Sequence, residues 1–290
     1  MKKILLCILV FFAAGYFVVM ETETGQDLFL DRLLSVMTQN QQTAPVDGLD
    51  VYICGASSPL STTGNAQSCV FIIAGDRSFV VDTGPGSPRV IRRLGLPLNN
   101  LEAVLLTHFH GDHISALGDV NFNSWVAGRG KKLTVMGPEG VDLVVNGFNQ
   151  AYSLDSSYRT RHHGWDILPL EYSVMQSKTI EAGLVFEEDG LSIRAFRVDH
   201  SPIEPAVGYR FDYKGRSVAV SGDSIVTEDY REAVDSVDLL LADALSEVLV
   251  SKMSEALSAN GNERTSKLIH DVLDYHASTT SLVEMAKQAK

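Results

Sequence analysis

The chain has 290 residues, 45% of them hydrophobic, and a formal net charge of −12. That length and hydrophobic content allow one large domain or two ordinary ones with a packed core, so size does not argue against an enzyme. An acidic surface repels a phosphate backbone, and the short basic run at 129–132 does not offset it, so nucleic acid is not favoured as a partner.

The N-terminus has the pattern of an export segment. Lys2 and Lys3 precede an apolar run over 4–20, which predicts a signal peptide or an uncleaved signal anchor over residues 1–20. The two lysines favour the cytoplasmic side, which sends the rest of the chain across the membrane. We therefore expect a bacterial periplasmic protein that is either secreted or tethered to the inner membrane. The polar residues 21–46 are predicted to be a linker.

The three cysteines are Cys7, Cys54 and Cys69. They form no CxxC metal pair and predict no disulfide framework.

The folded domain is predicted over 47–290, where strand patterns alternate with helical ones. A layered α/β sandwich fits two halves that are each strand-rich first and helical afterwards. A turn at Lys214 and Gly215 is expected to join two strands as a hairpin. The predicted strands are 50–55, 69–75, 78–84, 101–108, 131–138, 191–200, 206–215 and 216–224, and the predicted helices are 87–96, 139–152, 230–237 and 263–290.

One segment concentrates metal-type ligands. Residues 103–120, AVLLTHFHGDHISALGDV, begin as a buried strand and then present His108, His110, Asp112 and His113. If the chain is extended at His108 and His110, their side chains leave on the same face and can share one metal. Gly111 permits a sharp turn, after which Asp112 and His113 can bind a second metal or hold a water.

The segment THFHGDH has the HxHxDH signature of the metallo-β-lactamase superfamily, and further segments resemble the same family. FVVDTG resembles its first strand and turn, DHSPIEPAVGYR its third-ligand segment, VAVSGDS its bridging-carboxylate segment, and YHASTTSLVEMAKQAK a stretch of the ribonuclease Z and arylsulfatase-like branch. The resemblance covers roughly residue 49 to the C-terminus. It implies the α/β fold of that family, a four-layer αββα sandwich.

The resemblance also assigns roles to residues. It implies two zinc ions per complete chain, with metal ligands listed as His108, His110, Asp112, His113, His200 and Asp223. Asp82 would support the ligands from behind, Asp112 would orient a zinc-bound hydroxide or take its proton, and His276 would protonate the departing oxygen.

Several of these residues also fit purely structural roles. His200 fits a strand-end histidine bonded to the backbone, and Asp82 and Asp223 fit ordinary turn residues. His276 also fits a neighbour of a helix cap.

The family pattern departs from this sequence at the C-terminus. Relatives follow the His276 segment with one more strand, whose histidine completes the second metal site, whereas this sequence ends at Lys290. We therefore expect the last strand and helix to be missing, because the sequence is a fragment or because the second site is incomplete. His270 is expected at the surface.

The sequence determines the substrate less well than it determines the fold and the metal ligands. The favoured function is an exported metal-dependent hydrolase of small anionic ester substrates, either phosphodiesters or sulfate esters. Ribonuclease Z relatives carry a Gly-rich basic arm between the positions of His200 and Asp223, where this sequence has one short hairpin. A ribonuclease Z-like endoribonuclease remains the alternative, as does a catalytically impaired, membrane-tethered metal-binding module. A homodimer is also left open.

The interval 114–199 is expected to supply a substrate wall. Within it, Arg161, His162 and His163 are the candidate contacts to an anionic substrate. A solvated loop is the alternative.

Overall fold

A computed structural model describes residues 12, 15–37, 47–61 and 63–288, in two compact units, 1–43 and 44–290. In the first unit, residues 15–21 are helical and helix α2 (Glu23–Met37) occupies most of the predicted linker. Much of the predicted export segment, 1–11 with 13 and 14, lies outside the described residues. Among the residues described, no helix combines the length and apolar character needed to cross a membrane.

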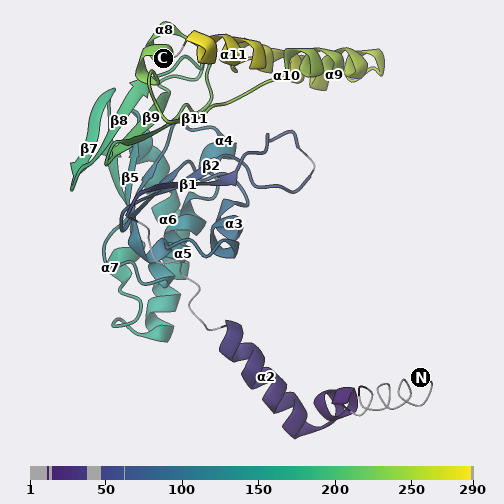
Figure 1. Ribbon diagram of the computed structural model, residues 1–290, viewed down its shortest axis with the longest axis vertical. Helices are drawn as coiled ribbons and strands as arrows, with labels where there is room; N and C mark the ends of the chain where they lie inside the picture. The colour runs from purple at the N-terminus through teal and green to yellow at the C-terminus, as the bar shows by residue number, and fades with distance from the viewer. Residues whose placement is uncertain (1–11, 13–14, 38–46, 62, 289–290) are drawn as a thin grey trace. The chain divides into compact units, whose positions relative to one another are not determined.

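The second unit contains two β-sheets (Figure 1). The first has the strand order β1-β2-β3-β4-β5-β6, and the second has the order β11-β10-β9-β8-β7. The first sheet comprises β1 (Leu49–Gly55), β2 (Cys69–Ala74), β3 (Arg77–Val81), β4 (Leu101–Leu105), β5 (Thr134–Gly137) and β6 (Gln176–Thr179). The second comprises β7 (Gly183–Glu188), β8 (Leu191–Arg197), β9 (Val207–Tyr213), β10 (Arg216–Val220) and β11 (Leu239–Leu241).

Helices occupy the connections between strands and the end of the unit. Those beside the first sheet are α3 (Ser87–Arg93), α4 (Gly111–Ile114), α5 (Leu117–Val126), α6 (Val141–His163) and α7 (Leu170–Ser173). Those after the second sheet begins are α8 (Glu228–Ala233), α9 (Glu247–Ala259), α10 (Glu263–Asp271) and α11 (Thr279–Gln288).

Side-chain alternation along the strands creates four layers. In β2, Phe71 packs with helix residues on the outer face of the first sheet, whereas Ile72 packs between the two sheets. The inter-sheet core also contains Phe79 and Phe211, whose ring centroids lie 5.9 Å apart. Because neighbouring strand residues point to opposite faces, one apolar strand can supply two cores.

The outer face of the second sheet is covered in the same way. Phe196 and Ala219 of the sheet pack against Tyr230 of α8 and Met285 of α11. Helices therefore cover both sheets, and the predicted αββα sandwich is confirmed.

The predicted hairpin is also confirmed. β9 and β10 pair antiparallel with Tyr213 opposite Arg216, so Lys214 and Gly215 alone make the turn. Both turn residues have positive φ, 49° and 77°, as a two-residue hairpin turn requires. Strands β6, β7 and β11 and helices α4, α5, α7 and α9 were not predicted.

The cysteine prediction was wrong. Cys54 and Cys69 form a disulfide with their Cα atoms 5.0 Å apart. β1 and β2 are antiparallel neighbours, and a register shift between Ile53 and Gly55 brings Gly55 opposite Cys69. That register places Cys54 within bonding reach, which the 15-residue spacing does not reveal.

Candidate metal centre

The strands bring the predicted site residues to one edge of the sandwich. β3 and β4 are parallel, so Asp82 and Thr107, which follow them, lie side by side. In the second sheet β8 and β10 run in the same direction, since both pair antiparallel with β9. Their ends therefore place His200 and Asp223 at this same edge.

The two sheets approach each other closely at the site. Gly222 has φ +66°, and a Cβ added there would lie 2.8 Å from Cβ of Thr107. Only glycine accommodates both the positive φ and the contact. Tyr209 bridges the sheets nearby by donating from its hydroxyl to the carbonyl of Leu106 at 2.8 Å. The segment carrying the histidines is thus fixed between the sheets.

Three imidazole nitrogens converge at the centre of the site. Nδ1 of His110 lies 3.1 Å from Nε2 of His108 and 3.4 Å from Nε2 of His200. With one oxygen of Asp223, these three nitrogens form a group in which all ligand atoms lie within 4.8 Å of one another. His108 and His200 are fully buried, so water does not solvate their nitrogens. Converging imidazole and carboxylate donors in a buried setting fit a transition-metal ion such as zinc.

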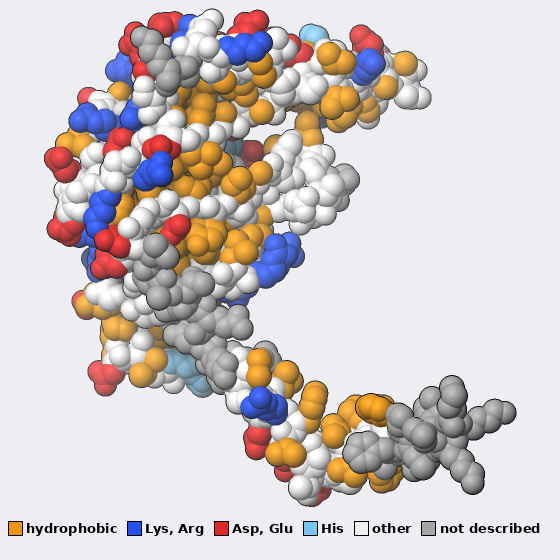
Figure 2. Space-filling model, viewed as in Figure 1, with side chains coloured by type: hydrophobic (Ala, Val, Ile, Leu, Met, Phe, Trp, Pro, Cys, Tyr) orange, Lys and Arg blue, Asp and Glu red, His pale blue; other side chains and the backbone are white. Residues whose placement is uncertain are grey.

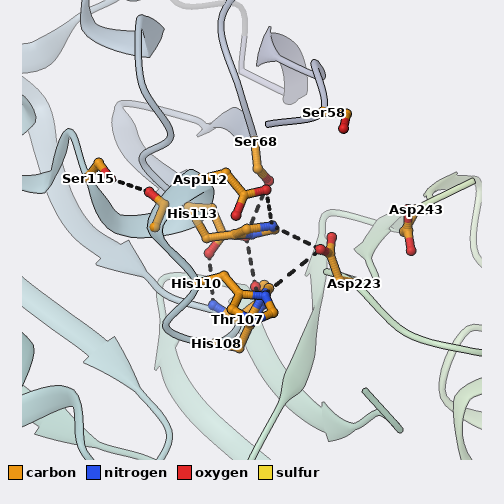
Figure 3. A network of polar contacts seen from close by, with 12 residues as sticks. Ser58, Ser68, Thr107, His108, His110, Asp112, His113, Ser115, Asp223 and Asp243 are labelled. Atoms are coloured by element: carbon orange, nitrogen blue, oxygen red, sulfur yellow. Dashed lines mark hydrogen bonds and ion pairs between the residues drawn. The ribbon is translucent and has the colours of Figure 1, made fainter. Parts of the chain in front are cut away.

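A second group shares one carboxylate with the first. Asp112, His113 and Asp223 also have ligand atoms within 4.8 Å of one another. Nε2 of His113 lies 3.2 Å from Oδ2 of Asp223 and 3.6 Å from Oδ2 of Asp112. Figure 3 shows Asp223 facing both His113 and His108. Two adjacent metal positions bridged by Asp223 fit this arrangement.

Asp82 holds these ligands from behind. Its carboxylate accepts hydrogen bonds from the backbone N and the hydroxyl of Thr107, at 2.9 and 2.8 Å. The same carboxylate lies 2.8 Å from Nδ1 of His113. This contact keeps a proton on Nδ1 of His113 and directs Nε2 at the site, where it could bind a metal once its own proton is displaced. Asp82 therefore contacts both His113 and the residue before His108.

Two other histidines are oriented in the same way. Nδ1 of His200 donates to the carbonyl of Tyr275 at 2.9 Å, and Nδ1 of His108 lies 3.1 Å from the hydroxyl of Thr107. In both, Nε2 is left to face the centre. Such outer contacts fix the tautomer and ring orientation of metal-binding histidines.

The environment lowers the pKa of two of the site histidines and raises that of a third. Burial, reinforced by the positive charge of His113, lowers the pKa of His108 to about 2, and burial also lowers the pKa of His200. Burial acts in the same direction on His113, but Asp82 and Asp223 outweigh it and raise the pKa of His113 well above its ordinary value. Burial raises and His113 lowers the pKa of Asp223, and the net shift is downward. Asp223 therefore remains a carboxylate.

A third group at the same edge, Asp223, Asp243 and His276, also has ligand atoms within 4.8 Å of one another. Nδ1 of His276 lies 2.6 Å from Oδ2 of Asp243 and 3.9 Å from Oδ2 of Asp223. Burial lowers the pKa of His276, but the hydrogen bond with Asp243 outweighs it and raises the pKa overall. The contact leaves Nε2 available to carry a proton. His276 thus lies beside both Asp243 and Asp223.

The site opens into a cavity of about 930 Å³. His110, Asp112, Asp223 and His276 are among its lining residues, together with residues of α9, α10 and the loop between β1 and β2. Figure 2 shows a hollow between this loop and the two helices. The site is therefore accessible to a substrate.

The predicted substrate contacts lie elsewhere. Arg161, His162 and His163 are exposed in the last turn of α6, and none of them lines the cavity. Arg161 instead lies over the ring of Tyr158, 5.3 Å from its centroid. The prediction failed because α6 continues for 23 residues and carries this cluster to its far end. His270, predicted at the surface, is exposed.

Several functional residues were not predicted. Thr107 immediately precedes His108, and its place in the motif is the signal that could have identified it. Asp243 could have been recognised as the residue after an apolar strand run, like Asp82. Tyr275 acts through its backbone carbonyl, for which a sequence offers no signal.

Comparison with known proteins identifies the family of this chain. The family model described as Beta-lactamase superfamily domain matches residues 77–288. A protein named Ribonuclease Z from Mycobacterium bovis is 30% identical over 244 residues, which cover 83% of this chain and 82% of that one. A protein of the same name from Mycolicibacterium gilvum is 32% identical, with 83% and 80% covered.

Solved structures share the fold. The short form of human tRNase Z aligns with a TM-score of 0.54 at 17% identity and covers 79% of this chain and 93% of that one. A diphosphatase of the PhnP family aligns with a TM-score of 0.56 at 17% identity and covers 83% of each chain.

Proposed function

Because this chain belongs to the metallo-β-lactamase superfamily and is a ribonuclease Z-like hydrolase of ester bonds, we propose that its reaction is metal-dependent hydrolysis of a phosphodiester. The observation that carries the proposal is that Asp223 joins the ligand group around His108 to the ligand group around His113. Zinc is the metal favoured by the histidine and carboxylate donors. When bound, two such ions would supply Lewis acidity and make hydroxide available at neutral pH.

The residues around the metal positions have separate tasks in this reaction. Asp112, at the edge of the cavity, would orient the attacking water and accept its proton. As the water oxygen bonds to phosphorus, the bond from phosphorus to the leaving oxygen breaks. His276, held at Nδ1 by Asp243, would donate its Nε2 proton to that oxygen. The products are a phosphomonoester and an alcohol.

RNA is the first substrate class to consider, because relatives named Ribonuclease Z align over 83% of this chain. A small phosphodiester is the second candidate. It is favoured by one observation: among the described residues, no lysine or arginine lines the cavity. RNA-binding surfaces neutralise several phosphates with such side chains.

The test compares both substrates on zinc-loaded protein. We expect hydrolysis of bis(p-nitrophenyl) phosphate that is lost in Asp112→Asn, and we would measure cleavage of a precursor tRNA beside it. The matched control is Asp142→Asn, an exposed aspartate at the start of α6. Failure of the folded, zinc-loaded protein to hydrolyse either substrate would refute the proposal. A sulfate ester assayed in parallel tests the remaining ester class.

We also propose that the domain acts outside the cytoplasm. The apolar N-terminal run supports this location. The Cys54–Cys69 disulfide supports it independently, since structural disulfides persist in oxidising compartments and are rare in the cytosol. Protease accessibility in bacterial cells with a permeabilised outer membrane tests it: digestion is expected, and full protection would contradict export.

A further inference from the structure

The cavity has one wall made by a helical arm, residues 247–271, which comprises α9 and α10. The arm begins just after Asp243 and ends just before His276, so its base is the pair that flanks the metal positions. At that base, the backbone N of Leu245 donates to the carbonyl of Ala277 at 2.8 Å. Figure 1 shows α9 and α10 reaching out from the second sheet.

Hydrogen bonds between buried serines hold α9 and α10 of the arm together. The hydroxyl of Ser254 donates to the carbonyl of Ser266, and the hydroxyl of Ser266 donates to the carbonyl of Ser254, at 3.0 and 2.8 Å. Both serines are buried between the two helices. These reciprocal bonds fix which faces of α9 and α10 turn toward the cavity.

The opposite wall is the loop 55–68 between β1 and β2, which the structure describes except at residue 62. The Cys54–Cys69 disulfide joins its two ends. Within the segment that the disulfide closes, the backbone N atoms of Ala56 and Ser57 both donate to the carbonyl of Ala66 at 3.0 Å. The loop therefore leaves the sheet as a closed structure and presents Leu60 to the cavity.

The side chains between these walls are mostly apolar. The arm contributes Val250, Met253, Leu268 and Ile269 to the cavity lining. Met253 and Leu268 are 48% and 56% exposed, and Leu60 of the loop is 50% exposed. Large apolar side chains left accessible beside a reactive site have surface to bury when a ligand enters.

Charge in the cavity is confined to the metal end. Within the described part of the chain, the acidic lining residues are Asp82, Asp112, Asp223 and Asp243, all at or behind the ligand groups. Lysine and arginine are absent from that lining, and its other polar side chains are the site histidines, Tyr275 and serines of the loop. An anionic phosphate can thus be neutralised at the metal positions and the adjacent His276, and a group that extends from it toward the arm and the loop meets uncharged side chains.

We propose that the cleft between the helical arm and loop 55–68 binds an uncharged alkyl or aryl group esterified to the phosphate. Met253 and Leu268 of the arm and Leu60 of the loop are its specificity-determining contacts. The inference rests on the proposed phosphodiester hydrolysis and names the substrate class. A second anionic residue, as in an RNA chain, has no cation in the described cleft to receive it.

The test uses a series of p-nitrophenyl alkyl phosphates with methyl, butyl and octyl groups on the zinc-loaded full chain. Each methylene that becomes buried is expected to raise kcat/KM about fourfold, until the chain outgrows the cleft. The double variant Met253→Ser with Leu268→Ser should flatten this dependence. Val248→Ser is the matched control, because Val248 lies on α9, is 65% exposed and does not line the cavity.

The outcomes separate this inference from the phosphodiesterase proposal. If the methyl ester is hydrolysed but kcat/KM does not rise with chain length, the apolar cleft is wrong while the reaction stands. If no ester is hydrolysed, the reaction is wrong, and calorimetric binding of octyl phosphate against methyl phosphate then decides the cleft. Equal affinities would overturn it, and tighter octyl binding that Met253→Ser with Leu268→Ser abolishes would support it.

Discussion

His113 and Asp82 are 31 residues apart in the chain, yet Nδ1 of the imidazole lies 2.8 Å from Oδ2 of the carboxylate. The contact ties the end of β3 to the segment after β4. The same carboxylate also accepts two hydrogen bonds from Thr107. Asp82 is 1% exposed, so its negative charge is balanced by these partners rather than by water.

Replacement of Asp82 by asparagine is therefore expected to weaken metal binding although Asp82 is not a ligand. Loss of such an outer partner typically costs about 10- to 100-fold in metal affinity. The imperfectly paired amide is also expected to lower the free energy of unfolding by about 1–3 kcal/mol. Zinc titration and chemical denaturation measure the two effects. Asp142→Asn should change neither, and unchanged zinc affinity in Asp82→Asn would contradict the supporting role.

Metal affinity should fall as the pH is lowered. In the metal-free protein the pKa of His113 is raised well above its ordinary value, so Nε2 carries a proton that a metal must displace. Below that pKa, affinity should fall by about tenfold per pH unit for this one proton. Asp223 adds no further dependence near neutral pH, because its pKa is lowered. Zinc dissociation constants measured from pH 6 to 8.5 check this slope.

The variant Asp82→Asn supplies the control for this pH dependence. Loss of the carboxylate removes an influence that raises the pKa of His113, so the slope should become shallower. An identical slope in both proteins would show that another group carries the proton.

His276 should matter most for poor leaving groups. His276→Gln removes the proton donor, so hydrolysis of an alkyl leaving group is expected to slow by about 10²–10⁴-fold. The p-nitrophenolate leaving group needs little protonation and should be affected far less. Steady-state rates with the two ester types measure this difference, and His270→Gln is the matched control on an exposed histidine. Equal losses for both leaving groups would assign His276 a structural or metal-binding role instead.

The disulfide should stabilise the domain measurably. Cys54 and Cys69 close a loop with a separation of 15 residues, for which loop entropy predicts about 3 kcal/mol of stabilisation. Thermal unfolding with and without a reductant measures it, and Cys54→Ala with Cys69→Ala should reproduce the reduced protein. Reductant should leave the melting temperature of that double variant unchanged. A wild-type melting temperature insensitive to reductant would argue against the bond.

The sequence predicted most of the site in the one segment that contains both a buried strand and several ligand residues. The apolar run before His108 and the spacing of His108 and His110 predicted both a buried strand and a shared site, and the structure brings them together with His200 and Asp223. The alternative of a strand-end histidine bonded to backbone also describes His200, since Nδ1 bonds to the carbonyl of Tyr275 while Nε2 faces the site.

Features that depend on tertiary placement could not be predicted. The Cys54–Cys69 bond depends on the register of β1 and β2, and the remoteness of Arg161 depends on the length of α6. The helix predicted over 263–290 is interrupted, since Tyr275 and His276 leave it to contact the site. In α9, Val248 and Met253 are both apolar, and only packing distinguishes the one that lines the cavity.

The metal content of the purified full chain tests the central claim most directly. Protein stripped by a chelator, dialysed against zinc and then freed of excess metal would be measured by elemental analysis. The groups around His108 and around His113, which share Asp223, predict two zinc ions per chain, with most of that metal lost in Asp223→Ala and none lost in His270→Ala. Less than one zinc ion per folded wild-type chain would contradict the metal centre.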